Sequence, residues 1–135
     1  MNRPNQEPQT QSEFKSKPGL QRIWHAFGYS LAGLKSAWQN EQAFRQELVL
    51  VVIGTIIALL IPVSGFEKLF LIASLILILI VELINSAIEA IVDRISLERH
   101  PLSKNAKDYG SAAVLLTCVI AAATWGLVLY DRFYY

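Results

Sequence analysis

Three long runs of apolar residues dominate this sequence of 135 residues. The runs are 48–66, 69–81 and 109–130, and none of them contains a charged side chain. An α-helix needs about 20 mostly apolar residues to cross the hydrocarbon core of a bilayer. The third run has that length. The first approaches it if its helix starts at Ala43 and ends near Ile61, and the second reaches it if its helix continues to Ile95.

The small amount of polar sequence indicates that these runs lie in a membrane. Hydrophobic residues make up 53% of the chain, so a soluble fold would have too little polar sequence to cover all three runs. A buried helix of a soluble protein would explain the second run alone. The expected fold is an all-α membrane protein with three transmembrane helices, at about 43–61, 67–95 and 108–131, and an N-terminal amphipathic interfacial helix.

The residues before the first span are predicted to form a tail and then that interfacial helix. Residues 1–18 are polar and contain three prolines, which is typical of a flexible tail. Between residues 20 and 40, apolar residues such as Trp24, Phe27 and Leu31 recur at helical spacing on one face. We expect this helix to lie in the membrane interface, with packing of its apolar face on protein as the alternative. Residues 19–135 are expected to form a single membrane domain.

Lysine and arginine residues predict the orientation of the chain. Arg22, Lys35 and Arg45 precede the first span, and four basic residues lie between residues 94 and 107. The other two ends of the spans have only Lys68 and Arg132. Because basic residues favour the cytoplasmic side, the N-terminus is expected in the cytoplasm and the C-terminus outside.

Three acidic residues follow the second apolar run in the same predicted helix. On a helical wheel Glu82, Asn85, Ser86, Glu89 and Asp93 fall on one narrow face, and the other faces are apolar. Carboxylates so close together repel one another and call for a cation, and oxygen ligands suit Mg²⁺. A solvated helix surface would explain Asp93 and Glu89 but not Glu82. A polar seam between helices would explain Asn85 and Ser86.

Other charged residues are predicted to reach the same side of the membrane. Glu41 precedes the first span, and Lys107 and Asp108 precede the third. Glu41 and Arg45 would alternatively pair with each other, and a Lys–Asp pair at a helix start often only caps the helix. No glycine-rich phosphate-binding loop occurs in the sequence. The pattern therefore predicts a metal-binding, anion-handling site at the cytoplasmic face. A cation path in a non-enzymatic membrane subunit is the alternative from another functional class.

Three of these segments resemble the small bacterial integral-membrane diacylglycerol kinase family. They read GYSLAGLKSAWQNEQAFRQE, VELINSAIEAIVDR and AKDYGSAAVL, and the resemblance runs from about Leu20 to the C-terminus. It implies a homotrimeric kinase of the bacterial inner membrane that uses MgATP to convert diacylglycerol into phosphatidic acid. A related branch phosphorylates undecaprenol, but the EQAFRQE segment is more similar to the diacylglycerol branch.

The resemblance also implies roles for individual residues. Glu82 matches the proposed general base, and Glu41 and Glu89 match the ligands of the Mg²⁺ on the ATP phosphates. The positions that match ATP contacts are Arg22, Tyr29, Glu41, Glu89, Glu98, Arg99, His100, Lys107 and Asp108. The positions that match the lipid and the reacting groups are Ser30, Lys35, Trp38, Ala43, Phe44, Arg45, Gln46, Glu47, Glu82, Asn85 and Ser111.

Small residues in the third span are expected to permit close packing between helices. Examples are Gly110, Ala113, Ala122 and Gly126. The lone cysteine, Cys118, excludes an internal disulfide and a cysteine-based zinc site.

Overall fold

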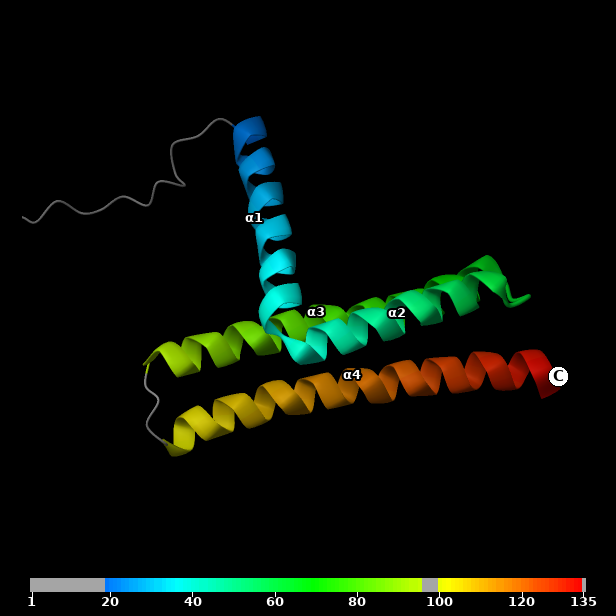
Figure 1. The fold of residues 1–135 in the computed structure, drawn as a ribbon. Helices are drawn as coiled ribbons and strands as arrows, with labels where there is room; N and C mark the ends of the chain where they lie inside the picture. Colours follow the sequence, from blue (N-terminus) through cyan, green and yellow to red (C-terminus); the bar gives the residue numbers. More distant parts are fainter. Residues whose placement is uncertain (1–18, 96–99, 135) are drawn as a thin grey trace, which may run out of the picture. The chain divides into compact units, whose positions relative to one another are not determined.

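The computed structural model describes residues 19–95 and 100–134, which form α-helices and no strands. The predicted tail 1–18 lies outside the described residues. The helices, drawn in Figure 1, are α1 (Gly19–Asn40), α2 (Gln42–Leu60), α3 (Gly65–Ile95) and α4 (Pro101–Tyr134). The chain divides after Lys35 into two compact units, so most of α1 belongs to the first unit and α2, α3 and α4 belong to the second.

Helices α2, α3 and α4 are long and apolar enough to cross a membrane. At 1.5 Å per residue, α2 is about 28 Å long and matches a hydrocarbon core of roughly 30 Å. Helices α3 and α4 have 31 and 34 residues and are longer than that core. Helix α4 begins at Pro101, upstream of the predicted start of the span at residue 108. The predicted fold class, an all-α membrane protein with three spans after an amphipathic helix, is confirmed.

Helix α3 is the central helix of the second unit and packs against both α2 and α4. The apolar core joins Val51 of α2, Leu75 and Ile78 of α3 and Ala121 of α4. The indole Nε1 of Trp125 in α4 donates a hydrogen bond of 3.2 Å to the carbonyl oxygen of Leu71 in α3. A polar bond between two spans is favourable in hydrocarbon, because no water competes for either group.

The outer faces of these helices carry large apolar side chains. Leu60 and Phe66 are each 78% exposed, and many other leucine, isoleucine and phenylalanine side chains are at least half exposed. An apolar groove of about 650 Å³ also runs along the three helices, with Ile53, Leu75 and Trp125 among its lining residues. Such surfaces are matched to hydrocarbon and not to water.

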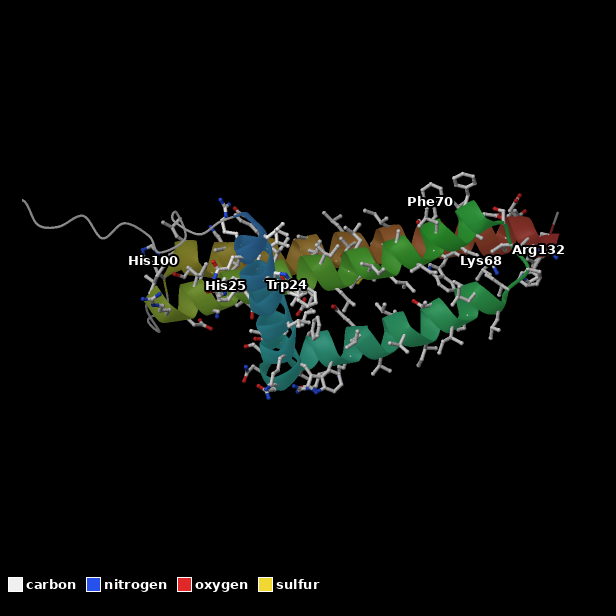
Figure 2. The ribbon with its side chains drawn as sticks, turned by 90° about the horizontal axis from the view of Figure 1, so that it is seen from above. Trp24, His25, Lys68, Phe70, His100 and Arg132 are labelled. Carbon is white, nitrogen blue, oxygen red and sulfur yellow. The ribbon has the colours of Figure 1, made fainter. Side chains whose placement is uncertain are left out.

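The two ends of the three-helix unit differ in how far their polar groups are hydrogen-bonded within the unit. Figure 2 shows Lys68 and Arg132 at one end and His100 at the opposite end. At the Lys68 end, Ser64 and Glu67 form a reciprocal capping box at the start of α3, with bonds of 2.6 and 3.3 Å. Lys68 Nζ donates a hydrogen bond of 2.7 Å to the carbonyl oxygen of Leu59 in α2. This end therefore satisfies its own backbone groups. The other end, where α2 begins, α3 ends and α4 begins, we call the carboxylate end.

The hydrogen bond of Trp125 generates a prediction about stability. Trp125→Phe keeps an aromatic ring in the core but removes the indole donor. We expect it to lower the free energy of unfolding by about 0.5–1.5 kcal/mol. Unfolding by sodium dodecyl sulfate in mixed micelles, followed by circular dichroism, measures the loss. Trp24→Phe on α1 is the matched control, and an equal loss in both variants would contradict the prediction.

Candidate active site

The polar stripe of α3 runs from a buried position to an exposed one. Glu82 is 5% exposed and Asn85 is 8% exposed, whereas Glu89 is half-buried and Asp93 is exposed. Glu82 lies about 26 Å along the helix from Gly65 at 1.5 Å per residue, close to the full thickness of a hydrocarbon core of roughly 30 Å. The stripe therefore starts where the apolar part of the span ends, and it continues toward the carboxylate end.

Three other carboxylates, from two helices and the junction before α2, lie within electrostatic range of Glu82. Glu82 interacts electrostatically with Glu41, Glu47 and Glu89. Glu41 is the single residue between α1 and α2, and it makes no side-chain capping bond to α2. Its carboxylate is therefore not used by the helix it precedes. The structure brings together the two predicted metal ligands, the predicted base and Glu47 of α2.

Two buried oxygens of this cluster have no hydrogen-bond partner in the described part of the chain. They are Oε2 of Glu47 and Oδ1 of Asn85. Other buried polar side chains in the spans are satisfied locally, since Ser74 and Thr117 each donate to a carbonyl three residues earlier in their own helix. An unpaired buried oxygen is costly. The unsatisfied atoms thus concentrate at the carboxylate cluster.

Two lysines of α4 pair with acidic residues at the edge of the cluster. Lys107 Nζ lies 2.6 Å from Asp93 Oδ1, and Lys107 also interacts electrostatically with Glu89. Lys104 forms an ion pair with Asp108 one turn along the same helix. Lys107 and Asp108 therefore have different partners, and Lys107 is the cation that α4 brings to the end of the α3 stripe.

The start of α2 is tied to the end of α1 by Arg45. Its Nη1 donates to the carbonyl oxygens of Trp38 and Gln39, at 2.9 and 3.2 Å, and these carbonyls belong to the last turn of α1. Arg45 is thus used as a C-terminal cap, although the sequence left a pair with Glu41 open. Phe44, 3% exposed, anchors the first turn of α2, and the neighbouring residues Ala43 and Gln46 are exposed.

The remaining predicted site residues lie on α1, at the start of α4, or outside the described residues. Arg22, Tyr29, Ser30 and Lys35 belong to the first unit, where Ser30 Oγ bonds to the carbonyl oxygen of Ala26.

The other four positions follow α3 along the chain. His100 Nδ1 accepts a hydrogen bond from the backbone of Leu102 and so caps α4. Ser111 is exposed on α4. Glu98 and Arg99 lie outside the described residues.

The donors present suit a Mg²⁺ ion that arrives with a nucleotide. Within residues 19–95 and 100–134, no three His, Cys, Asp or Glu side chains are arranged to hold a metal ion by themselves. Protein-bound Mg²⁺ commonly takes only one or two carboxylates and completes its shell with phosphate oxygens and water. Glu41 and Glu89 provide that number, and the unpaired oxygens of Glu47 and Asn85 lie in the same cluster.

Sequence reasoning missed several contacts of the structure. The capping box at the start of α3, at the end opposite the site, was readable as the Ser-x-x-Glu pattern of residues 64–67. The bonds from Arg45 to the α1 carbonyls and the pair between Lys107 and Asp93 have no comparable local pattern. Gly110, predicted only to permit close packing, is buried and lies directly against the side chain of Asn85.

Comparison with known proteins identifies the family. Residues 28–129 match the sequence model of a family described as prokaryotic diacylglycerol kinase. This chain belongs to the prokaryotic diacylglycerol kinase family. It is therefore a bacterial membrane protein of that family, as the resemblance in the sequence predicted.

Several curated relatives of this family cover most of the chain. A protein of Pseudomonas aeruginosa named diacylglycerol kinase is 54% identical over 118 residues, which are 87% of this chain and 96% of the relative. The diacylglycerol kinase of Escherichia coli K12 is 50% identical over 85% of this chain and 94% of its own. That of Haemophilus influenzae is 43% identical over 83% of this chain and 95% of its own.

The ion pair between Lys107 of α4 and Asp93 of α3 yields a prediction about stability. Its side chains are 38% and 52% exposed, and exposed ion pairs contribute little. Asp93→Asn is expected to change the free energy of unfolding by less than about 1 kcal/mol. Asp131→Asn, near the end of α4, is the control in the same detergent titration. A loss well above that of the control would show that the pair holds α3 and α4 together.

Proposed function

We propose that this protein transfers the γ-phosphoryl group of MgATP to the hydroxyl of diacylglycerol and so forms phosphatidic acid. The observation that carries the proposal is the buried carboxylate of Glu82, which lies where the apolar part of α3 ends and interacts electrostatically with three further carboxylates. Its relatives in Pseudomonas aeruginosa and Escherichia coli are named diacylglycerol kinase.

Glu82 is the general base in this proposal. A lipid hydroxyl sits at headgroup depth, so the group that removes its proton has to lie near the membrane interface. Glu82 follows the apolar part of α3, which places it near that depth in this proposal, and its side chain is buried. A base within hydrogen-bond reach of the hydroxyl takes its proton as the bond from the hydroxyl oxygen to the γ-phosphorus forms, while the bond from the γ-phosphorus to the bridging oxygen breaks and ADP leaves.

Glu41, Glu89 and Lys107 bind MgATP in this proposal. Phosphoryl transfer depends mainly on alignment and on neutralising the charge of the phosphates. Glu41 and Glu89 would hold the Mg²⁺ of MgATP, which would supply that neutralisation when bound. Lys107 adds a positive charge beside Glu89. The nucleotide also contacts the positions matched in the family, which are Arg22, Tyr29, Glu98, Arg99, His100 and Asp108.

The carboxylate end faces the cytoplasm in this proposal, because ATP is available there. Arg45, Arg94, Lys104 and Lys107 lie toward this end, and Lys68 and Arg132 lie at the other. Positively charged residues favour the cytoplasmic side of the inner membrane. The C-terminus is then periplasmic, the amphipathic α1 lies in the interface beside the lipid substrate, and three copies of the chain assemble as a homotrimer.

A lipid competition assay tests the reaction and the substrate together. Purified protein in mixed micelles receives radiolabelled ATP, Mg²⁺ and equal amounts of diacylglycerol and undecaprenol. We expect labelled phosphatidic acid as the main product, because the EQAFRQE segment and the names of the relatives favour the glycerolipid. Labelled undecaprenyl phosphate as the main product would transfer the proposal to another lipid alcohol. No labelled lipid at all would favour a non-enzymatic cation-binding subunit.

Substitution of Glu82 tests its proposed role. Glu82→Gln keeps the size of the side chain and removes its ability to accept a proton. We expect kcat to fall about 10²–10⁴-fold, while binding of MgATP, measured by protection against thermal unfolding, changes little. Glu67→Gln, at the opposite end of α3, is the matched control. A Glu82→Gln enzyme with the turnover of the unaltered protein would remove Glu82 from the mechanism.

A further inference from the structure

We propose that Gly110 of α4 is a positioning residue for the reaction, because its missing side chain leaves the space in which Asn85 holds the carboxylate of Glu89. The inference rests on the proposed function, since Glu89 is assigned there as a ligand of the MgATP complex. Gly110 has no role in that assignment. It is placed in the site by its contact with Asn85 across the interface between α3 and α4.

The contact between Gly110 and Asn85 leaves no room for a larger residue. A Cβ atom built on Gly110 would overlap Asn85 Oδ1, and it would lie 3.2 Å from Asn85 Cγ and 3.7 Å from Asn85 Cβ. Both residues are buried. Because Asn85 Oδ1 has no hydrogen-bond partner in the described part of the chain, it is held in place by shape and not by a bond of its own.

The other end of the same amide reaches the proposed metal ligand. Asn85 Nδ2 donates to Glu89 Oε1 at 3.3 Å, one turn along α3. The amide group is planar, so a displacement of Oδ1 also displaces Nδ2. A Cβ at position 110 would therefore move the donor that orients Glu89. The contacts from Gly110 to Asn85 and from Asn85 to Glu89 therefore link the backbone of α4 to a carboxylate of α3.

The other glycines in the spans show that this arrangement is specific. Gly126 lies on the same helix, and a Cβ there would meet nothing within 4 Å. A Cβ at Gly54 would meet the end of the Leu75 side chain, in the apolar core. Among the described glycines, Gly110 alone would press on a polar side chain of the carboxylate cluster. Glycine inside a helix is less favourable than alanine, so Gly110 lowers the stability of α4 relative to an alanine at that position.

The decisive variants are Gly110→Ala and, as the matched control, Gly126→Ala. Both add one methyl group to α4 and raise its helix propensity equally. We expect Gly110→Ala to lower kcat about 10- to 100-fold, the cost of a misplacement of about 1 Å. The Mg²⁺ concentration for half-maximal rate should also rise, which a merely structural role would not produce. Gly126→Ala should leave both quantities as in the unaltered protein, and identical behaviour of the two variants would overturn the inference.

A double-mutant cycle tests whether the effect passes through Asn85. Asn85→Ala removes the atoms that the new methyl group would displace. In that background, Gly110→Ala should change the residual kcat by less than about twofold. An undiminished effect in the Asn85→Ala background would overturn the inference. If Gly110→Ala alone fails to fold, the double variant should still fold, and its failure to do so would also refute the proposal.

A readout independent of activity separates this inference from the proposed function. In protein labelled with ¹⁵N-asparagine, the side-chain amide signal that disappears in Asn85→Ala belongs to Asn85. We expect this signal to shift in Gly110→Ala and to stay in place in Gly126→Ala. A protein without kinase activity but with this shift would refute the proposed function and keep the positioning of Asn85. A protein that has kinase activity but whose Asn85 signal does not shift in Gly110→Ala would keep the proposed function and refute the positioning of Asn85.

Discussion

The free-energy cost of placing charge in hydrocarbon governs the layout of this protein. Apart from Glu67 in its first turn, helix α3 keeps its acidic residues on one face, and these residues begin only where its apolar stretch ends. Its neighbours then supply the groups that meet this face: Glu47 from α2, Lys107 from α4 and Glu41 from the junction before α2. The carboxylates are thus held away from lipid by the same three-helix packing that forms the apolar core.

The two ends of the helical unit differ in the number of polar groups left unsatisfied. At the turn between α2 and α3, Ser64, Glu67 and Lys68 satisfy the helix ends with local bonds. At the carboxylate end, buried oxygens of Glu47 and Asn85 have no partner in the described ranges. Local satisfaction is typical of a structural turn. Unsatisfied oxygens beside several carboxylates are typical of a site that completes its bonding with a ligand.

The spans and the acidic stripe could be predicted from the sequence because hydropathy and helical periodicity are local properties. Glu82, Asn85 and Glu89 lie on one face of a helix whatever surrounds it. The contact of Gly110 with Asn85 and the bond from Lys107 to Asp93 depend on how α4 packs against α3, which no local pattern encodes. The start of α4 is an intermediate case: Pro101 is favourable in the first turn of a helix, yet the uncharged run begins only at residue 109.

The length of α3 links the chemistry to the host membrane. The helix has 31 residues, about 46 Å at 1.5 Å per residue, and a hydrocarbon core is roughly 30 Å thick. About one third of it must therefore stand outside the apolar layer. Bilayers that are thicker or thinner than this span force a helix to tilt or the lipid to deform. The depth of Glu82 relative to the lipid headgroups is consequently a property of the protein and its bilayer together, and acyl-chain length becomes a physical variable of the active site.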